Sequence, residues 1–110
     1  MENQKLYKGS LNTIILKVLG ENTKMYGYEI TQKVKQITEG KLNITEGALY
    51  PALHKLEADG LLDVEVLKVD NRLRKYYKLT EIGEQYLKEL QISWRELVEA
   101  VNKTIDNKNI

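Results

Sequence analysis

The stretch TEGALYPALHKLEADG, residues 45–60, decides the fold. Thr45 is a favourable helix N-cap, Glu46 complements the positive end of a helix dipole, and Gly60 is a typical C-terminal stop. Together they predict a helix, although its interior contains Pro51, the single proline of the chain. An interior proline removes one backbone hydrogen bond and crowds the preceding turn, at a cost of roughly 3 kcal/mol. The position of Pro51 around the helix therefore decides whether the helix can hold it.

At about 100° per residue, the predicted helix has an apolar face and an outward face. The apolar face gathers Leu49, Ala52, Leu53 and Leu56, whereas Gly47, Tyr50, Pro51, His54 and Ala58 lie outward, with Lys55 at the edge. Pro51 and the carbonyl that it leaves unpaired, on Gly47, both face a side where water or a partner can satisfy that carbonyl. The outward face combines small, hydrogen-bonding and cationic side chains, which suits close approach to DNA. A solvated helix face is the alternative interpretation.

Two shorter helices are predicted upstream of this stretch. The first has Ser10 as its N-cap and ends at Gly20, and its apolar face consists of Leu11, Ile14, Ile15 and Val18. The second follows the sequence YGY, residues 26–28, and ends at Gly40, with an apolar stripe of Ile30, Val34 and Ile37. Three short helices in about fifty residues must pack on one another to bury these faces.

Downstream of residue 60 the hydrophobic period changes to two, which predicts a β-hairpin. In the first run Leu62, Val64 and Val66 alternate with acidic residues. In the second run one face consists of Leu73, Lys75, Tyr77 and Leu79. The sequence Asp70-Asn71 between the two runs is the predicted turn.

The predicted hairpin contains a local concentration of positive charge. The formal net charge is only +1. The cationic side chains of the hairpin, set against Asp70 alone in residues 68–78, are Lys68, Arg72, Arg74, Lys75 and Lys78. Such a patch neutralises phosphates and makes affinity for DNA depend on salt. An edge strand that uses charge to deter aggregation is the alternative interpretation.

A long final helix is predicted from Glu81 to about Ile105, with Thr80 as its N-cap. Its apolar residues follow the 3.5-residue seam of a coiled-coil-like partner face. At 1.5 Å per residue the helix spans roughly 35–40 Å, longer than the preceding three-helix unit can cover. We therefore expect a homodimer interface along this helix, formed by Leu90, Trp94, Leu97, Val101 and Ile105.

Composition bounds the chemistry of the chain. Its 110 residues suit one domain near the size at which a second copy helps to bury apolar surface. With no cysteine and one histidine, the sequence excludes disulfides and thiolate sites, and it predicts no metal site and no cofactor. No nucleophile–base arrangement or phosphate loop is found, so an enzyme is not expected. The first residues, MENQKLYKG, contain no apolar signal region, and no apolar run reaches membrane-spanning length, so we expect a cytoplasmic protein without a membrane partner.

Three helices followed by a basic hairpin is the order of a winged helix-turn-helix. The expected fold class is therefore mainly α with a small β-hairpin, an α+β fold. Residues 1–79 form the winged DNA-binding domain and residues 80–110 the C-terminal dimerisation helix. In this class the third helix enters the major groove of DNA and the hairpin tip lies on the backbone or minor groove. The predicted major-groove contacts are Thr45, Gly47, Tyr50, Pro51, His54 and Lys55, and the predicted phosphate or minor-groove contacts are Arg72, Arg74 and Lys75.

Three blocks of this sequence resemble the signature blocks of the PadR family of bacterial transcriptional regulators. They are GYEI at residues 27–30, EGALYPALHKLEADGLL at 46–62 and RKYYKLTEIG at 74–83. The resemblance covers about residues 9–100 and implies a homodimer of winged-helix domains that usually represses transcription. It also implies that the C-terminal helix and the first helix join the two copies. The chain differs at the hairpin turn, where it has KVDNR, residues 68–72, and relatives often have glycine-rich tips.

The resemblance is to the short subfamily, which includes multidrug-sensing repressors, and it implies a ligand site at Trp94. Across the dimer axis, the two indoles would sandwich a small planar aromatic or cationic ligand. The other expected lining residues are Asn12, Thr13, Leu90 and Val98. The alternative is that Trp94 simply fills the dimer seam.

The leading prediction is a dimeric, sequence-specific repressor that binds double-stranded operator DNA and is released by such a ligand. Its two recognition helices would read half-sites about one helical turn apart. One alternative is a small-molecule sensing or sequestering protein whose winged helix does not bind DNA. Another is a winged helix that binds a different protein. The clustered cations of the hairpin favour DNA over both.

Overall fold

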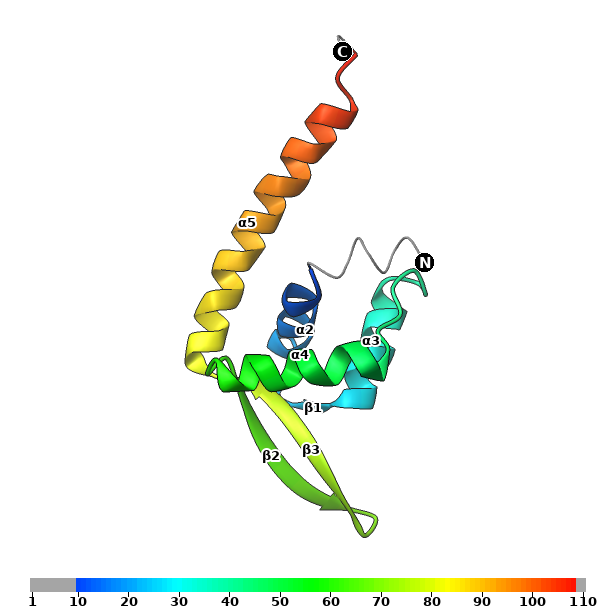
Figure 1. The fold of residues 1–110 in the computed structure, drawn as a ribbon, viewed down its shortest axis with the longest axis vertical. Helices are drawn as coiled ribbons and strands as arrows, with labels where there is room; N and C mark the ends of the chain where they lie inside the picture. Colours follow the sequence, from blue (N-terminus) through cyan, green and yellow to red (C-terminus); the bar gives the residue numbers. More distant parts are fainter. Residues whose placement is uncertain (1–9, 109–110) are drawn as a thin grey trace.

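The computed structural model describes residues 10–108, which fold as a winged helix with a long C-terminal helix (Figure 1). The elements are α2 (Leu11–Gly20), β1 (Met25–Tyr26), α3 (Gly27–Ile37), α4 (Glu46–Ala58), β2 (Leu62–Val69), β3 (Arg72–Leu79) and α5 (Glu81–Ile105). The four predicted helices and the hairpin are thus confirmed. The two-residue strand β1 was not predicted, because two residues are too few to show an alternating pattern.

Helix α4 is continuous through Pro51, which lies on its exposed side as the sequence predicts. Leu49 and Leu53 are completely buried, and Leu56 is 1% exposed. The Thr45 hydroxyl accepts a hydrogen bond from the amide of Ala48 at 3.2 Å, which caps the helix. The missing hydrogen bond at Pro51 therefore lies toward solvent and leaves the core undisturbed.

The core lies where α2, α3 and α4 meet, and it extends to the base of the sheet and the first turns of α5. The largest fully buried side chains are Ile15, Leu16, Leu19, Ile30, Val34, Leu49, Leu53, Leu56, Leu62 and Tyr77. Leu87 of α5 joins the same cluster. One core therefore fixes the three helices and the hairpin relative to one another.

The stripe predicted on α3 is correct for Ile30 and Val34 but wrong for Ile37, which is 58% exposed. Helix α3 ends at this residue, and the chain then reverses through Gly40 at a φ of 81°. The reversal brings Ile44 into the core, where it is 7% exposed. Ile44 is thus a core residue that the pattern did not indicate, whereas Ile37 is not one.

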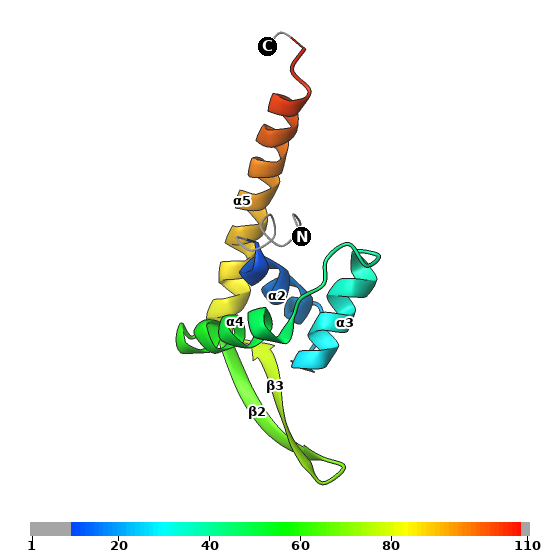
Figure 2. The ribbon, with the colours of Figure 1, turned by 45° about the vertical axis from the view of Figure 1, so that its right-hand side comes forward.

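The three strands form an antiparallel sheet in the order β1–β3–β2, and the β2–β3 hairpin projects away from the helices (Figure 2). Asp70 and Asn71 both have positive φ, 51° and 65°, which is the backbone of a type I′ turn. The predicted turn is therefore confirmed. Leu73 lies near the tip and is 78% exposed, because the hairpin extends beyond the helices that would cover it.

The start of α5 is joined firmly to the end of α4. The Thr80 hydroxyl donates to the carbonyl of Gly60 at 2.7 Å and accepts from the amide of Gly83 at 2.9 Å. Gly83 packs directly on the carbonyl of Leu61, where a Cβ atom would collide with that oxygen. This close approach sets the direction in which α5 leaves the winged domain.

Helix α5 packs against α2 over its first half and then extends beyond the winged domain (Figure 1). Among the described residues, no helix is long and apolar enough to cross a membrane.

Candidate nucleic-acid interface

A groove of about 430 Å³ lies between α4, β3 and the beginning of α3. Its lining residues are Tyr26, Gly27, Tyr28, Tyr50, His54, Leu73, Arg74, Lys75 and Tyr77. The groove thus combines residues of the predicted recognition helix with residues of the hairpin, which we call the wing. Aromatic hydroxyls, one imidazole and two cations meet there, and such groups donate hydrogen bonds to phosphate and base edges.

The outward face of α4 is solvent-exposed at every position where the sequence predicts a DNA contact. These positions are Thr45, Gly47, Tyr50, Pro51, His54 and Lys55. The Lys55 ammonium lies 3.5 Å from a carboxylate oxygen of Asp59, and both side chains are well exposed. Such a surface pair is weak and easily exchanged for a phosphate partner.

Tyr50 also has a structural contact that the sequence did not predict. Its ring lies on Gly27, the first residue of α3, so closely that a Cβ atom at Gly27 would collide with the hydroxyl and ring of Tyr50. Glycine at this position therefore lets α4 and the start of α3 approach each other. Tyr50 remains 37% exposed, so part of its surface still faces the groove.

The cations predicted to bind phosphate lie on both faces of the wing. Lys75 shares a face with the buried Tyr77, toward α4, whereas Arg72 and Arg74 alternate onto the opposite face. Between residues 10 and 108, no ion pair involves Arg72, Arg74 or Lys75. The positive charge of the wing tip is therefore not neutralised by the described part of the chain.

Arg74 differs from the other two cations because an aromatic ring supports it. Its guanidinium carbon lies 4.1 Å from the centroid of the Tyr26 ring. Tyr26 is not among the site residues that the sequence predicts. The contact depends on the pairing of β1 with β3, which joins residues about fifty positions apart and leaves no local pattern.

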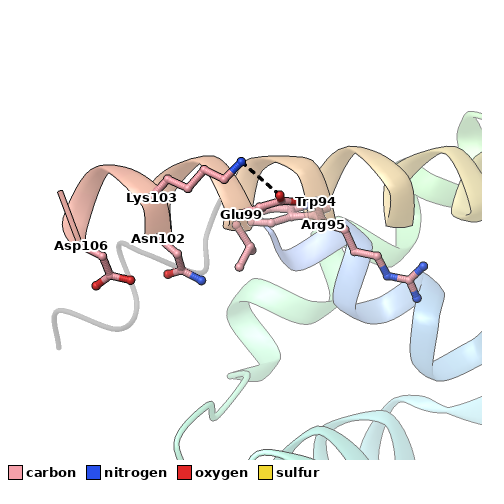
Figure 3. Close-up of a pocket in the computed structure, with 7 residues that line it drawn as sticks. Trp94, Arg95, Glu99, Asn102, Lys103 and Asp106 are labelled. Carbon is pink, nitrogen blue, oxygen red and sulfur yellow. Dashed lines mark ion pairs between the residues drawn. The ribbon is translucent and has the colours of Figure 1, made fainter.

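The predicted ligand site lies on a different part of the chain, along α5. The Trp94 indole nitrogen donates to the hydroxyl of Thr13 in α2 at 2.8 Å. A groove of about 680 Å³ runs beside the indole (Figure 3), lined by Trp94, Arg95, Val98, Glu99, Asn102, Lys103 and Asp106. Two of its charged residues pair with each other, since the Lys103 ammonium lies 3.3 Å from Glu99.

Of the five residues predicted to line the ligand site, Trp94 and Val98 line this groove, and Thr13 contacts Trp94 through the hydrogen bond without lining the groove. Asn12 is exposed on α2 and Leu90 packs against the core of its own chain, and neither lines this groove. The predicted dimer residues Leu97, Val101 and Ile105 are 52%, 45% and 72% exposed. They continue toward the C-terminus the stripe that contains Trp94.

Three helices, a projecting two-stranded wing and an exposed third helix define the class of winged helix-turn-helix proteins. The family model "Transcriptional regulator PadR-like family" matches residues 15–89. The chain belongs to this family and is a transcriptional regulator. Regulators of this family bind DNA and are not enzymes.

Relatives of known sequence and structure agree with this assignment. The chain is 36% identical over 80 residues to transcriptional regulator Rv3488 of Mycobacterium tuberculosis, covering 73% of this chain and 72% of that protein. A PadR-like transcription factor from Bacteroides fragilis is 40% identical, with a TM-score of 0.75 and coverage of 93% and 96%. A transcriptional regulator from Clostridium thermocellum is 31% identical, with a TM-score of 0.83 and coverage of 90% and 96%.

Tyr77, a buried residue that lines the groove, makes the stability of the fold depend on pH in the alkaline range. Burial raises the pKa of the Tyr77 phenol above 10.0, and the charges of Glu57 and Tyr50 act in the same direction. The folded state thus holds the phenolic proton more tightly than the unfolded state. Between the unfolded pKa and the higher folded pKa, the folded state binds more protons, so the free energy of unfolding falls as the pH rises.

We therefore expect Tyr77→Phe to flatten the loss of stability above pH 10. The measurement is urea unfolding at a fixed protein concentration at pH 8, 9, 10 and 11. The difference between wild type and Tyr77→Phe should be constant up to about pH 9 and should shift in favour of the variant at pH 11. Tyr86→Phe on α5 is the control, because Tyr86 is 40% exposed and lies outside the core. Parallel curves for wild type and Tyr77→Phe over the whole range would contradict the expectation.

Proposed function

We propose that this chain is a dimeric, sequence-specific DNA-binding repressor of transcription. The observation that carries the proposal is the unneutralised cationic wing beside an exposed α4 face. If the cations of the wing were paired with carboxylates of the chain, binding to phosphate would gain little free energy. Among the described residues, Arg72, Arg74 and Lys75 have no carboxylate partner.

In this proposal residues 1–79 bind DNA, with α4 in the major groove. Gly47 and Pro51 let the helix approach closely, and His54 and Lys55 reach the edges of bases or the adjacent phosphates. Arg72, Arg74 and Lys75 contact the backbone or the minor groove and fix the register of α4. A repressor of this kind acts by occupying an operator that overlaps a promoter.

The proposed dimer uses residues 80–110. Around α5, the residues Leu87, Trp94 and Val101 lie within about 40° of one another, so a single stripe begins in the core and continues beyond it. Its first part is covered by α2, and its second part has no cover from residues 10–108. A second copy of α5 with the same stripe suits this face, because twofold symmetry makes an apolar stripe self-complementary. The two α4 helices would then read half-sites of a pseudo-palindrome.

We further propose that a planar aromatic or cationic ligand binds beside Trp94 and relaxes DNA affinity. The hydrogen bond to Thr13 holds the indole in one orientation and leaves its face beside an open groove. The aromatic face of Trp94 and the carboxylate of Asp106 suit a flat cation, whereas the carboxylate of Glu99 is already paired with Lys103. Because the same indole is bonded to α2, a ligand there acts on the contact between α5 and the winged domain.

The DNA proposal predicts a steep loss of affinity when two wing cations are removed. Arg72→Ala/Lys75→Ala should lower the slope of log K against log salt concentration by about 0.9 for each lost phosphate contact. The measurement is fluorescence anisotropy with a labelled duplex from the DNA upstream of its own gene, with mixed-sequence duplex as competitor. Lys88→Ala/Lys108→Ala removes the same charge from α5 and its C-terminal side and serves as control. If wild type bound this duplex no more tightly than mixed-sequence DNA at low salt, and other upstream fragments likewise, the proposal would be rejected.

The dimer proposal predicts that charge on the exposed stripe produces monomers. Leu97→Glu/Val101→Glu should shift the sedimentation coefficient from that of a dimer to that of a monomer at micromolar concentration. Ile92→Glu is the matched control, since Ile92 is equally exposed but lies on the other side of α5. A wild-type chain that sediments as a monomer, or a dimer unaffected by the double substitution, would contradict the interface.

The ligand proposal can be tested with intrinsic fluorescence, because Trp94 is the single tryptophan of the chain. Titration with berberine, a planar cation, or with p-coumarate, a phenolic acid, should quench that emission. Val98→Lys should weaken berberine binding at least about tenfold by placing an ammonium in the groove. Ile92→Lys is the control on the opposite side of α5. Equal quenching of wild type and Val98→Lys would place the dye elsewhere.

A further inference from the structure

Alternating cationic and aromatic side chains cross the wing sheet on the face opposite Tyr77, and Tyr26 and Arg74, at one end of this row, also line the groove beside α4. The Lys24 ammonium lies 5.8 Å from the centroid of the Tyr76 ring. The rings of Tyr76 and Tyr26 meet edge to face with their centroids 5.5 Å apart. Arg74 then stacks on Tyr26 at 4.1 Å and ends the row at the wing.

Tyr26 is held in place from three directions. Its backbone pairs with Tyr76 in the β1–β3 ladder. Its amide donates to a carboxylate oxygen of Glu29 at 3.1 Å, which also closes the first turn of α3. Its ring packs edge to face against the ring of Tyr76. The ring of Tyr26 is therefore a fixed platform at the point where α3 begins.

The two cations of the row differ in what compensates their charge. The Lys24 ammonium lies 2.9 Å from a carboxylate oxygen of Glu65, so its charge is used within the sheet. Arg74 makes no ion pair with any residue between 10 and 108. Stacking occupies the flat face of a guanidinium and leaves the donors in its plane available. Arg74 also lines the groove between α4 and the wing.

An arginine on a strand edge ordinarily samples many rotamers, and ordering it on DNA costs side-chain entropy. Arg72 and Lys75 are exposed, and within residues 10–108 neither makes a cation–π contact that would order it before binding. Arg74 alone among the three is half-buried and supported by a ring. Its conformation is thus set before DNA arrives.

We propose that Tyr26 is a positioning residue for DNA binding, which holds Arg74 in the conformation that donates to a backbone phosphate beside the groove. This inference rests on the proposed function, since it assigns a role to a residue within the same interface. It also assigns a role to β1, because the pairing of β1 with β3 places the Tyr26 ring against Arg74.

A double-mutant cycle tests the inference. Arg74→Ala, Tyr26→Leu and the double variant are compared by anisotropy with the duplex from the DNA upstream of its own gene. Tyr26→Leu should weaken binding about two- to fivefold, as the loss of an exposed cation–π contact implies. In the Arg74→Ala background the same change should have no further effect, because the group that Tyr26 positions is absent.

A conservative variant separates the ring from the hydroxyl. Tyr26→Phe retains the platform and should bind DNA as wild type does. Tyr86→Leu, which removes an exposed ring from α5, should also leave binding unchanged. Thermal unfolding checks that Tyr26→Leu is folded, and Tyr26→Met, which fills a similar volume without a ring, replaces it if it is not.

Additive losses in the cycle, or a loss in Tyr26→Phe as large as in Tyr26→Leu, would overturn the role given to the ring. In either case wild-type binding would still stand, so only this inference would fall. Absence of wild-type binding to DNA would instead reject the proposed function, and the inference with it.

Discussion

Burial of one face of α4 is the constraint on which the rest of the structure depends. Leu49, Leu53 and Leu56 are almost completely buried, and each such side chain contributes roughly 1.5–3 kcal/mol relative to exposure. Because three leucines fix the rotation of the helix, they also determine that Gly47, Pro51 and His54 face solvent. The exposed face of the helix is thus a consequence of the buried one. A proline on the buried face would instead have left the carbonyl four residues before it unpaired and away from water, at a much greater cost.

Most of the fold follows from local patterns, because periodicity, caps and turn residues act over a few positions. Thr45, Thr80 and the Asp70-Asn71 turn mark element boundaries that the structure confirms. The prediction that Ile37 is a core residue was wrong, because an apolar stripe along a helix does not show where that helix stops contributing to the core. Ile44 is in the core instead, and it follows a reversal at Gly40 whose path no local signal specifies.

The candidate site was predictable in part, and its missing members share a cause. Exposed positions of α4 and the cations of the wing could be found from the sequence, since both depend on spacing within one element. The contacts of Tyr26 with Arg74 and of Tyr50 with Gly27 join separate elements. They depend on a two-residue strand and on the close approach of the Tyr50 ring to Gly27, and neither produces a periodic pattern in the sequence. The sequence shows the glycine and tyrosines of the YGY segment, but it does not show that Tyr26 contacts Arg74 or that Gly27 contacts Tyr50.

The single stripe along α5 connects the two ends of the proposed regulator. Leu87 lies in the core of the winged domain, and Trp94, two turns further along the helix, is bonded to Thr13 of α2. Helix α2 contributes Ile15, Leu16 and Leu19 to the core on which α4 also packs. A change in the position of the Trp94 indole can therefore be transmitted to α4 through α2. Close-packed interiors transmit such shifts, because they have little free volume to absorb them. Release of DNA by a ligand at Trp94 then requires that the ligand bind one arrangement of α5 and α2 more tightly than the other, since differential affinity alone moves such an equilibrium.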